Sequence, residues 1–218
     1  MGAASDRLVF LLLSLAVLPA VLSLPPEAAE RFQAFSLGLP APAAVFLAAA
    51  IGVVTLSALE GLGFRRGVPE RPVRGLALAA ALASLLAAPP IVIDLTNPFA
   101  ADINTPLPEA LLFYPAIAIV AEAALHLLPL ALVFAATRST VVATIVAALT
   151  EPIFQTAFAP TEQPAWQTGF VALHVFVFGA VGLTLYRRYG LVALIGLRVV
   201  YYLWWHIFWG AARLSLLF

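Results

Sequence analysis

The chain has 218 residues, of which 63% are hydrophobic and only 10% are charged, and its mean hydropathy is +1.04. Water-soluble domains are about half apolar and about a quarter charged, so this composition excludes a soluble globular protein, a disordered chain and a nucleic-acid-binding protein. Eleven acidic residues balance eleven basic ones, and there is no cysteine. The composition therefore predicts an all-α polytopic membrane protein whose surroundings are the lipid bilayer, without disulfides or thiol chemistry.

Seven segments are long and apolar enough to cross a bilayer as helices, which takes about 20 residues each. In chain order they are residues 8–24, 42–59, 75–95, 110–136, 141–158, 169–186 and 191–213. Pro25 and Pro26 follow the first segment and predict its end there, whereas Pro89 and Pro90 leave open a break in the third. We expect a single integral membrane domain over residues 1–218, without an internal repeat.

The distribution of arginine predicts the orientation of these spans. Seven arginines lie in or beside alternate loops, namely Arg65, Arg66, Arg71, Arg74, Arg138, Arg187 and Arg188. The other loops carry Asp102, Glu109 and Glu162, and their one arginine is Arg31. Because cytoplasmic loops are enriched in basic residues, the amino terminus is predicted to be cytoplasmic and the carboxyl terminus to lie outside.

Aromatic residues fit this orientation. Membrane proteins concentrate tryptophan at the two interfaces of the bilayer. An aromatic belt at the outer interface accounts for the positions of Trp166, Trp204, Trp205 and Trp209. We expect an integral, multi-pass protein of a prokaryotic cytoplasmic membrane.

Six ionisable side chains lie inside the last four spans: Glu122, His126, Glu151, His174, Arg198 and His206. A charged group costs about 2.5–3.5 kcal/mol at the bilayer centre on insertion scales, so such residues face the interior of a bundle. At a rise of about 1.5 Å per residue, Glu122, Glu151 and Arg198 reach nearly the same depth on three helices. His126 follows Glu122 by one turn on the same helix face. We therefore expect these groups to meet.

Two interpretations of this cluster are open. Glu122, Glu151 and Arg198 could neutralise one another and hold three helices in register, or they could be catalytic, with Glu122 as a general base. In the second case His126, alone or with His174 or His206, would join the carboxylates as a ligand of Zn²⁺, which would activate a water molecule. His174 and His206 form a second level nearer the outer face, where they could also make only local hydrogen bonds.

The stretch FGAVGLTLYRRYGLVALIGLRVVYY, residues 178–202, resembles the CPBP, or Abi, family of membrane endopeptidases, which includes the type II CAAX prenyl proteases. Members show a glycine-containing span, a Tyr-Arg-Arg-x-Gly turn and a span with His-x-x-x-Asn. Two earlier motifs are Glu-Glu-x-x-x-Arg and Phe-x-x-x-His. The resemblance covers the last four spans, about half of the chain.

Matched helix by helix, the first family motif falls on residues 121–126, where Glu122 is kept and His126 replaces arginine. The second falls on residues 147–151, with Glu151 in place of histidine, and the third on Arg198 and Tyr202. A rival match uses residues 150–155 and 170–174, which keeps His174 but leaves one span too few. The first match preserves helix order.

The resemblance implies a helical bundle with a membrane-embedded site for metal-assisted or glutamate-activated hydrolysis. Its substrate would be a membrane peptide or a lipidated substrate, and its cofactor could be zinc. Two other functions remain open. The same residues could form a midplane relay in a proton- or ion-coupled transporter, or the chain could be a non-catalytic membrane scaffold or subunit.

Overall fold

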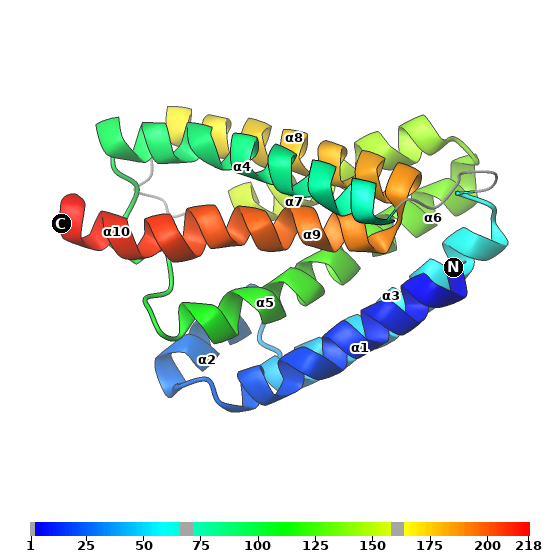
Figure 1. Ribbon diagram of the computed structural model, residues 1–218, viewed down its shortest axis with the longest axis horizontal. Coiled ribbons are helices and arrows are strands. Elements are labelled where there is room, and N and C mark those ends of the chain that lie inside the picture. The colour runs from blue at the N-terminus through cyan, green and yellow to red at the C-terminus, as the bar shows by residue number, and fades with distance from the viewer. Residues whose placement is uncertain (1–2, 66–71, 158–163) are drawn as a thin grey trace.

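The computed structural model describes residues 3–65, 72–157 and 164–218, and in these ranges it contains helices and no strand. The first half comprises α1 (Ala3–Leu22), the short α2 (Pro26–Phe35), α3 (Ala41–Gly61), α4 (Pro72–Thr96) and the 3₁₀ turn η1 (Ala101–Ile103). The second half comprises α5 (Ala110–Ala121), η2 (Glu122–Leu127), α6 (Leu128–Thr137), α7 (Thr140–Ala157), α8 (Ala165–Tyr189), α9 (Leu191–Tyr202), η3 (Leu203–Phe208) and α10 (Trp209–Leu216). These helices form one bundle (Figure 1).

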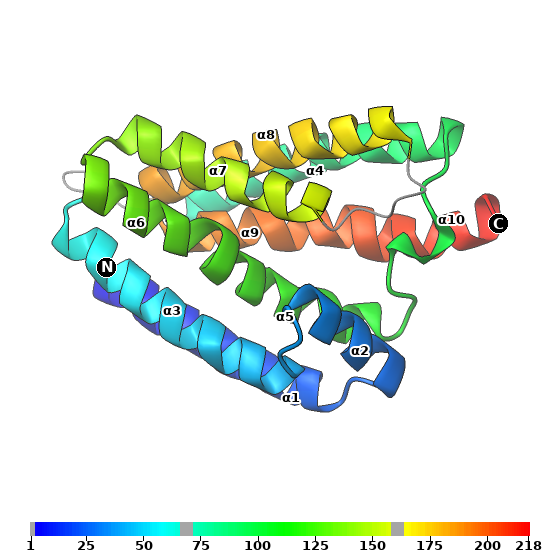
Figure 2. The same cartoon turned by 180° about the vertical axis from the view of Figure 1, so that it is seen from behind.

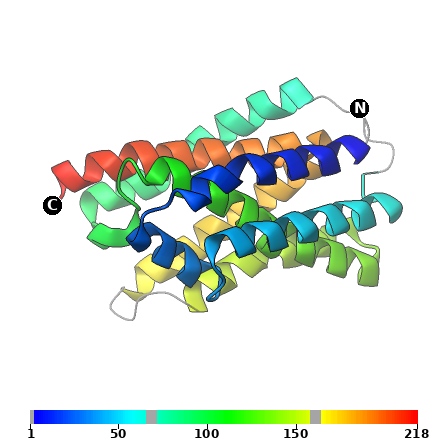
Figure 3. The same ribbon diagram turned by 90° about the horizontal axis from the view of Figure 1, so that it is seen from below.

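Six helices of the described part are long and apolar enough to cross a membrane: Ala41–Gly61, Pro72–Thr96, Ala110–Thr137, Thr140–Ala157, Ala165–Tyr189 and Leu191–Leu216. They coincide with six of the seven predicted spans. The remaining predicted span, residues 8–24, coincides with α1, a helix of 20 residues. It lies alongside α3 in all three views of the bundle (Figures 1–3).

Successive long helices run in alternate directions, so that the amino and carboxyl termini lie at opposite ends (Figure 3). The carboxyl-terminal ends of α3 and α8 and the turn between α6 and α7 lie at the end that holds the amino terminus, on the right of Figure 1. Arg65 follows the end of α3, Arg188 lies in the last turn of α8, and Arg138 lies in the turn between α6 and α7. Arg66, Arg71 and Glu162 lie outside the described residues. The arginine-rich loops that were predicted to share one side of the membrane therefore share one end of the bundle.

Proline and glycine mark several helix boundaries. Pro26 opens α2 and Pro40 precedes α3, because proline needs no partner for a missing N–H in the first turn. Gly190, with φ of 90°, makes the sharp turn between α8 and α9. The possible break at Pro89 and Pro90 is absent, since α4 continues through both residues. Membrane helices tolerate such prolines when neighbouring groups satisfy the freed backbone.

Two predicted spans are interrupted by π-helical turns. The helix over residues 110–137 contains η2, which carries Glu122 and His126, and the helix over residues 191–216 contains η3, which carries His206. A π-helical turn adds a residue to the ordinary helical turn and occurs frequently at functional sites. Both interruptions therefore coincide with ionisable residues that the sequence singled out.

Candidate functional site

Glu122, His126, Glu151 and Arg198 meet inside the bundle, and we call them the central cluster. They come from η2, α7 and α9, and each side chain is at most 5% exposed to solvent. The expectation that Glu122, Glu151 and Arg198 meet is confirmed by these contacts. His126 joins them, as its position one turn after Glu122 predicted.

Arg198 is the centre of this cluster. Its Nε donates to Glu122 Oε1, while Nη1 and Nη2 donate to the two oxygens of Glu151 at 3.0 and 2.7 Å. Nη1 also donates to the hydroxyl of Tyr202 at 2.9 Å, and Nη2 lies 3.1 Å from His126 Nδ1. A guanidinium has five N–H donors, and all of them are directed at neighbours in the cluster.

His126 Nδ1 has two neighbours of opposite character. It lies 3.0 Å from Glu122 Oε2, which can only accept a hydrogen bond from it, and 3.1 Å from Arg198 Nη2, which can only donate one. A protonated Nδ1 therefore bonds to Glu122, and an unprotonated one bonds to Arg198. His126 Nε2 lies 3.4 Å from Glu151 Oε2 and makes no hydrogen bond within the described part of the chain.

The charges of the central cluster do not cancel when His126 is neutral. Two glutamates and one arginine then leave one negative charge, and one further proton makes the cluster neutral. An uncompensated charge is costly inside a protein or a bilayer. The central cluster is therefore one positive charge short of balance when His126 is neutral.

Close helix packing leaves room for His126 at Gly179 of α8. A Cβ added to Gly179 would lie 2.9 Å from His126 Nε2 and 3.4 Å from the backbone of Ala148. The aromatic rings of Phe178 and Tyr202 lie 5.1 and 5.6 Å from the guanidinium carbon of Arg198. Rings at this distance attract a cation through their π-electrons, so they help to hold Arg198 in the apolar interior.

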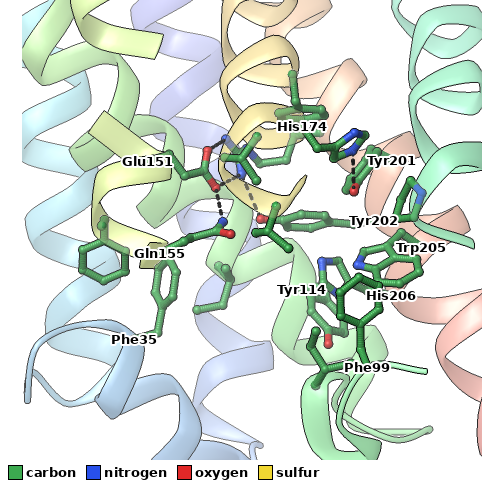
Figure 4. A pocket seen from close by; sticks show the side chains of 18 of the residues that line it. Phe35, Phe99, Tyr114, Glu151, Gln155, His174, Tyr201, Tyr202, Trp205 and His206 are labelled. Atoms are coloured by element: carbon green, nitrogen blue, oxygen red, sulfur yellow. Dashed lines mark hydrogen bonds and ion pairs between the residues drawn. The ribbon is translucent and has the colours of Figure 1, made fainter. Parts of the chain in front are cut away.

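A cavity of about 640 Å³ extends from the central cluster toward the end of the bundle that carries α2. Glu151 and Arg198 border its deep part, and the exposed residues Arg31 and Ala34 of α2 border its mouth. Aromatic side chains form much of its wall, among them Phe35, Phe99, Phe113, Phe154, Phe170 and Trp205. Figure 4 shows Glu151, Gln155 and Tyr202 converging on the deep part of this space.

The other two predicted histidines also border the cavity, each with a partner of its own. His174 Nε2 lies 3.1 Å from the hydroxyl of Tyr201, and His206 Nδ1 lies 2.7 Å from Asn104 Oδ1. The ring of His206 stacks on Tyr114 at 4.3 Å between centroids. The second level predicted for these histidines is thus a polar wall of the cavity.

The residues of the cluster do not fit zinc. Zn²⁺ needs free carboxylate oxygens or imidazole nitrogens at about 2 Å, and the guanidinium of Arg198 takes three of the four glutamate oxygens. His174 and His206, the other predicted ligands, bond elsewhere. Among residues 3–65, 72–157 and 164–218, no group of three or more candidate ligands could hold a metal ion. The expectation of a metal site at His126, His174 and His206 therefore has no support.

A second buried ion pair escaped the sequence analysis. Arg213 of α10 donates through Nε and Nη2 to both oxygens of Asp94 in α4, at 2.6 and 2.9 Å. Arg213 also donates to the backbone carbonyls of Phe99 and Ala100, and Asp94 accepts from Trp209 Nε1. Both charged side chains are fully buried. Asp94 and Arg213 have opposite charges near the same end of two predicted spans, which is the signal that could have revealed them.

The aromatic belt is only partly as predicted. Trp166 and Trp204 are 49% and 44% exposed, as residues at an interface should be. Trp205, in contrast, is buried against the cavity, and Trp209 is the donor to Asp94. The π-helical turn η3 contains Trp204 and Trp205 and ends directly before Trp209.

Comparisons with protein-family models, with curated proteins and with solved structures gave no match to this chain.

Proposed function

We propose that this chain binds an amphipathic small molecule within the bilayer, in the cavity that ends at Glu151 and Arg198. The cavity itself carries the proposal. Its volume of about 640 Å³ lies in the range of about 300–1,000 Å³ that is typical of ligand sites. Such sites are mainly apolar with a few convergent polar groups, and this cavity combines aromatic walls with a polar deep part.

The polar group of the ligand is an uncharged one, such as a hydroxyl or a carbonyl. The donors of Arg198 are already directed at Glu122, Glu151, Tyr202 and His126, so no free positive charge faces an anion. The Tyr202 oxygen accepts from Arg198, and its own O–H donates to no other described residue, so it is available to a ligand. A prenyl or acyl chain, whether free or attached to a peptide, suits the aromatic walls.

A relationship to the CPBP family is part of the proposal. The three motif positions matched in the sequence, at Glu122 with His126, at Glu151, and at Arg198 with Tyr202, are in contact with one another. Residues that match three separate family motifs can form one site only if their side chains are in contact. With Arg198 among the carboxylates, the site would bind a lipidated or prenylated molecule without the metal-dependent hydrolysis that the family resemblance implies. The proposed setting is a prokaryotic cytoplasmic membrane with the arginine-rich end inside.

Three molecules with the same C15 body test this proposal: farnesol, farnesylamine and farnesoic acid. Native mass spectrometry of the purified protein would measure the fraction of protein that carries each probe. We expect farnesol to bind and farnesoic acid to bind at least about tenfold more weakly, the effect of about 1.4 kcal/mol. Equal binding of all three would mean that the protein does not recognise the polar group of the probe.

A matched pair of variants on α8 locates the binding. Val171 lines the cavity, whereas Leu173 is 64% exposed on the outside of the bundle. Val171→Trp fills the cavity and should abolish farnesol binding, and Leu173→Trp should leave it unchanged. Thermal unfolding in detergent shows whether both variants fold. Loss of binding in both, or in neither, contradicts the cavity as the site.

Proton-coupled transport is a second candidate, and the charge imbalance of the central cluster favours it. A buried cluster that one further proton would neutralise, beside a cavity that reaches Glu151, is what a midplane relay requires. Proteoliposomes that contain a pH-sensitive dye would show proton uptake, which Glu122→Gln should abolish. Absence of proton flux with and without farnesol contradicts this candidate while leaving the binding proposal intact.

A further inference from the structure

A second cavity lies at the opposite, arginine-rich end of the bundle, between α7 and α8. It has a volume of about 450 Å³. These two helices run side by side along the face shown in Figure 2. Thr140 and Thr144 of α7 and Thr184 of α8 line the cavity, together with Arg187 and Arg188 in the last turn of α8. None of these residues lines the cavity at Glu151.

The arginines of this cavity are available to a ligand. Both side chains are exposed, and within the described ranges neither guanidinium has a hydrogen-bond, ion-pair or ring partner. Each carries several N–H donors, which suit the oxygens of a phosphate group. The hydroxyls of Thr140 and Thr144 make no hydrogen bond to another described residue and add two more donors.

The position of the cavity points to a lipid phosphate. The first turn of α7 meets the last turn of α8 here, at the end of two predicted spans, which is the level of phospholipid headgroups. Val141 and Ile145, 61% and 46% exposed, also line the cavity and offer an apolar surface to an acyl chain. Basic pockets between membrane helices on the cytoplasmic side are known to take anionic headgroups.

We propose that the cavity between α7 and α8 binds the headgroup of an anionic phospholipid, with its phosphate held by Arg187, Arg188 and the hydroxyls of Thr140 and Thr144. The acyl chains lie along Val141 and Ile145. This site is separate from the cavity at the central cluster and does not depend on the function proposed there. A headgroup with no net charge would leave the positive charges of the two arginines without a net opposite charge.

Native mass spectrometry with dioleoyl phosphatidylglycerol and dioleoyl phosphatidylcholine tests this site. We expect one phosphatidylglycerol to remain bound at concentrations where phosphatidylcholine does not. The double variant Arg187→Gln/Arg188→Gln should weaken phosphatidylglycerol binding by about tenfold or more, because each arginine near a membrane surface contributes about a fivefold effect. Thr144→Val, which keeps both charges, should weaken it by a smaller factor.

Arg74→Gln is the matched control, since Arg74 is an exposed arginine at the start of α4 that does not line this cavity. It should leave binding unchanged. Equal losses in Arg74→Gln and in the double variant would overturn the site in favour of a general effect of basic charge. Unchanged binding in the double variant, or displacement of the lipid by inorganic phosphate at the same concentration, would overturn it as well.

Discussion

The bundle contains two buried arginine–carboxylate clusters that differ in net charge. Near the end that carries the carboxyl terminus, Arg213 faces a single carboxylate, Asp94, and its other N–H groups reach backbone carbonyls. In the central cluster, Arg198 faces two carboxylates and a histidine. The first cluster has no net charge. The second has one net negative charge when His126 is neutral, and one further proton would neutralise it.

The two clusters also differ in their surroundings. Neither Asp94 nor Arg213 borders the cavity of about 640 Å³, whereas Glu151 and Arg198 do. The neutral pair of Asp94 and Arg213 also bonds to the backbone carbonyls of residues 99–101, which is typical of an ion pair that stabilises the packing of α4 against α10. An unbalanced cluster beside a cavity has the features of a site. Both clusters are buried, so it is the net charge and the access to a cavity, and not burial alone, that support the central cluster as the proposed site.

The largest expected effect comes from breaking the balanced pair. Asp94→Asn leaves Arg213 buried without a counter-charge, and breaking such a pair costs about 3–5 kcal/mol. Thermal or denaturant unfolding in detergent measures the loss. The double variant Asp94→Asn/Arg213→Gln should recover part of it. If Asp94→Asn alone is as stable as the parent, the Asp94–Arg213 pair does not stabilise the packing of the helices.

A smaller effect is expected where α8 packs against His126. Gly179→Ala places a methyl group 2.9 Å from His126 Nε2, and such overpacking typically costs about 1–3 kcal/mol. Gly169→Ala is the matched control on the same helix, because no atom lies within 4 Å of its added Cβ. Equal stability of the two variants in unfolding experiments would mean that Gly179 does not set the position of His126.

The smallest effect on stability is expected for Glu151→Gln. Arg198 keeps Glu122 as its counter-ion, and the cluster becomes neutral without the extra proton, so the free energy of unfolding should fall by only about 1 kcal/mol. Farnesol affinity should fall by about tenfold, because Glu151 holds the guanidinium of Arg198, which in turn holds the Tyr202 hydroxyl that faces the ligand. A fall in the free energy of unfolding as large as that of Asp94→Asn would contradict the interpretation that only the Asp94–Arg213 pair is chiefly structural.

The sequence predicted the helices and the central cluster for simple physical reasons. Apolar length identifies membrane spans, and a constant rise per residue allowed Glu122, Glu151 and Arg198 to be compared in depth. The arginine-rich loops were predicted to share a side, and they share one end. These predictions depend only on regular helix geometry.

What the sequence did not reveal depends on departures from that geometry. The π-helical turns η2 and η3 were not predicted, and Trp205, which lies within η3, was expected at the interface but lies against the cavity. Four of the ten residues of the short helix α2 are polar or charged, and the helix borders the cavity mouth, a role that no hydropathy pattern expresses. Asp94 and Arg213 lie near span ends, where a charge ordinarily needs no partner.

The most direct test of the account measures farnesol affinity and the free energy of unfolding for Glu151→Gln and Asp94→Asn side by side. Both substitutions change a buried carboxylate to an amide. We predict that Glu151→Gln stays nearly as stable as the parent and loses binding, while the folded fraction of Asp94→Asn binds farnesol with the affinity of the parent. Glu151→Gln that binds normally, or equal losses of stability in both variants, would contradict the assignment of the central cluster as the site.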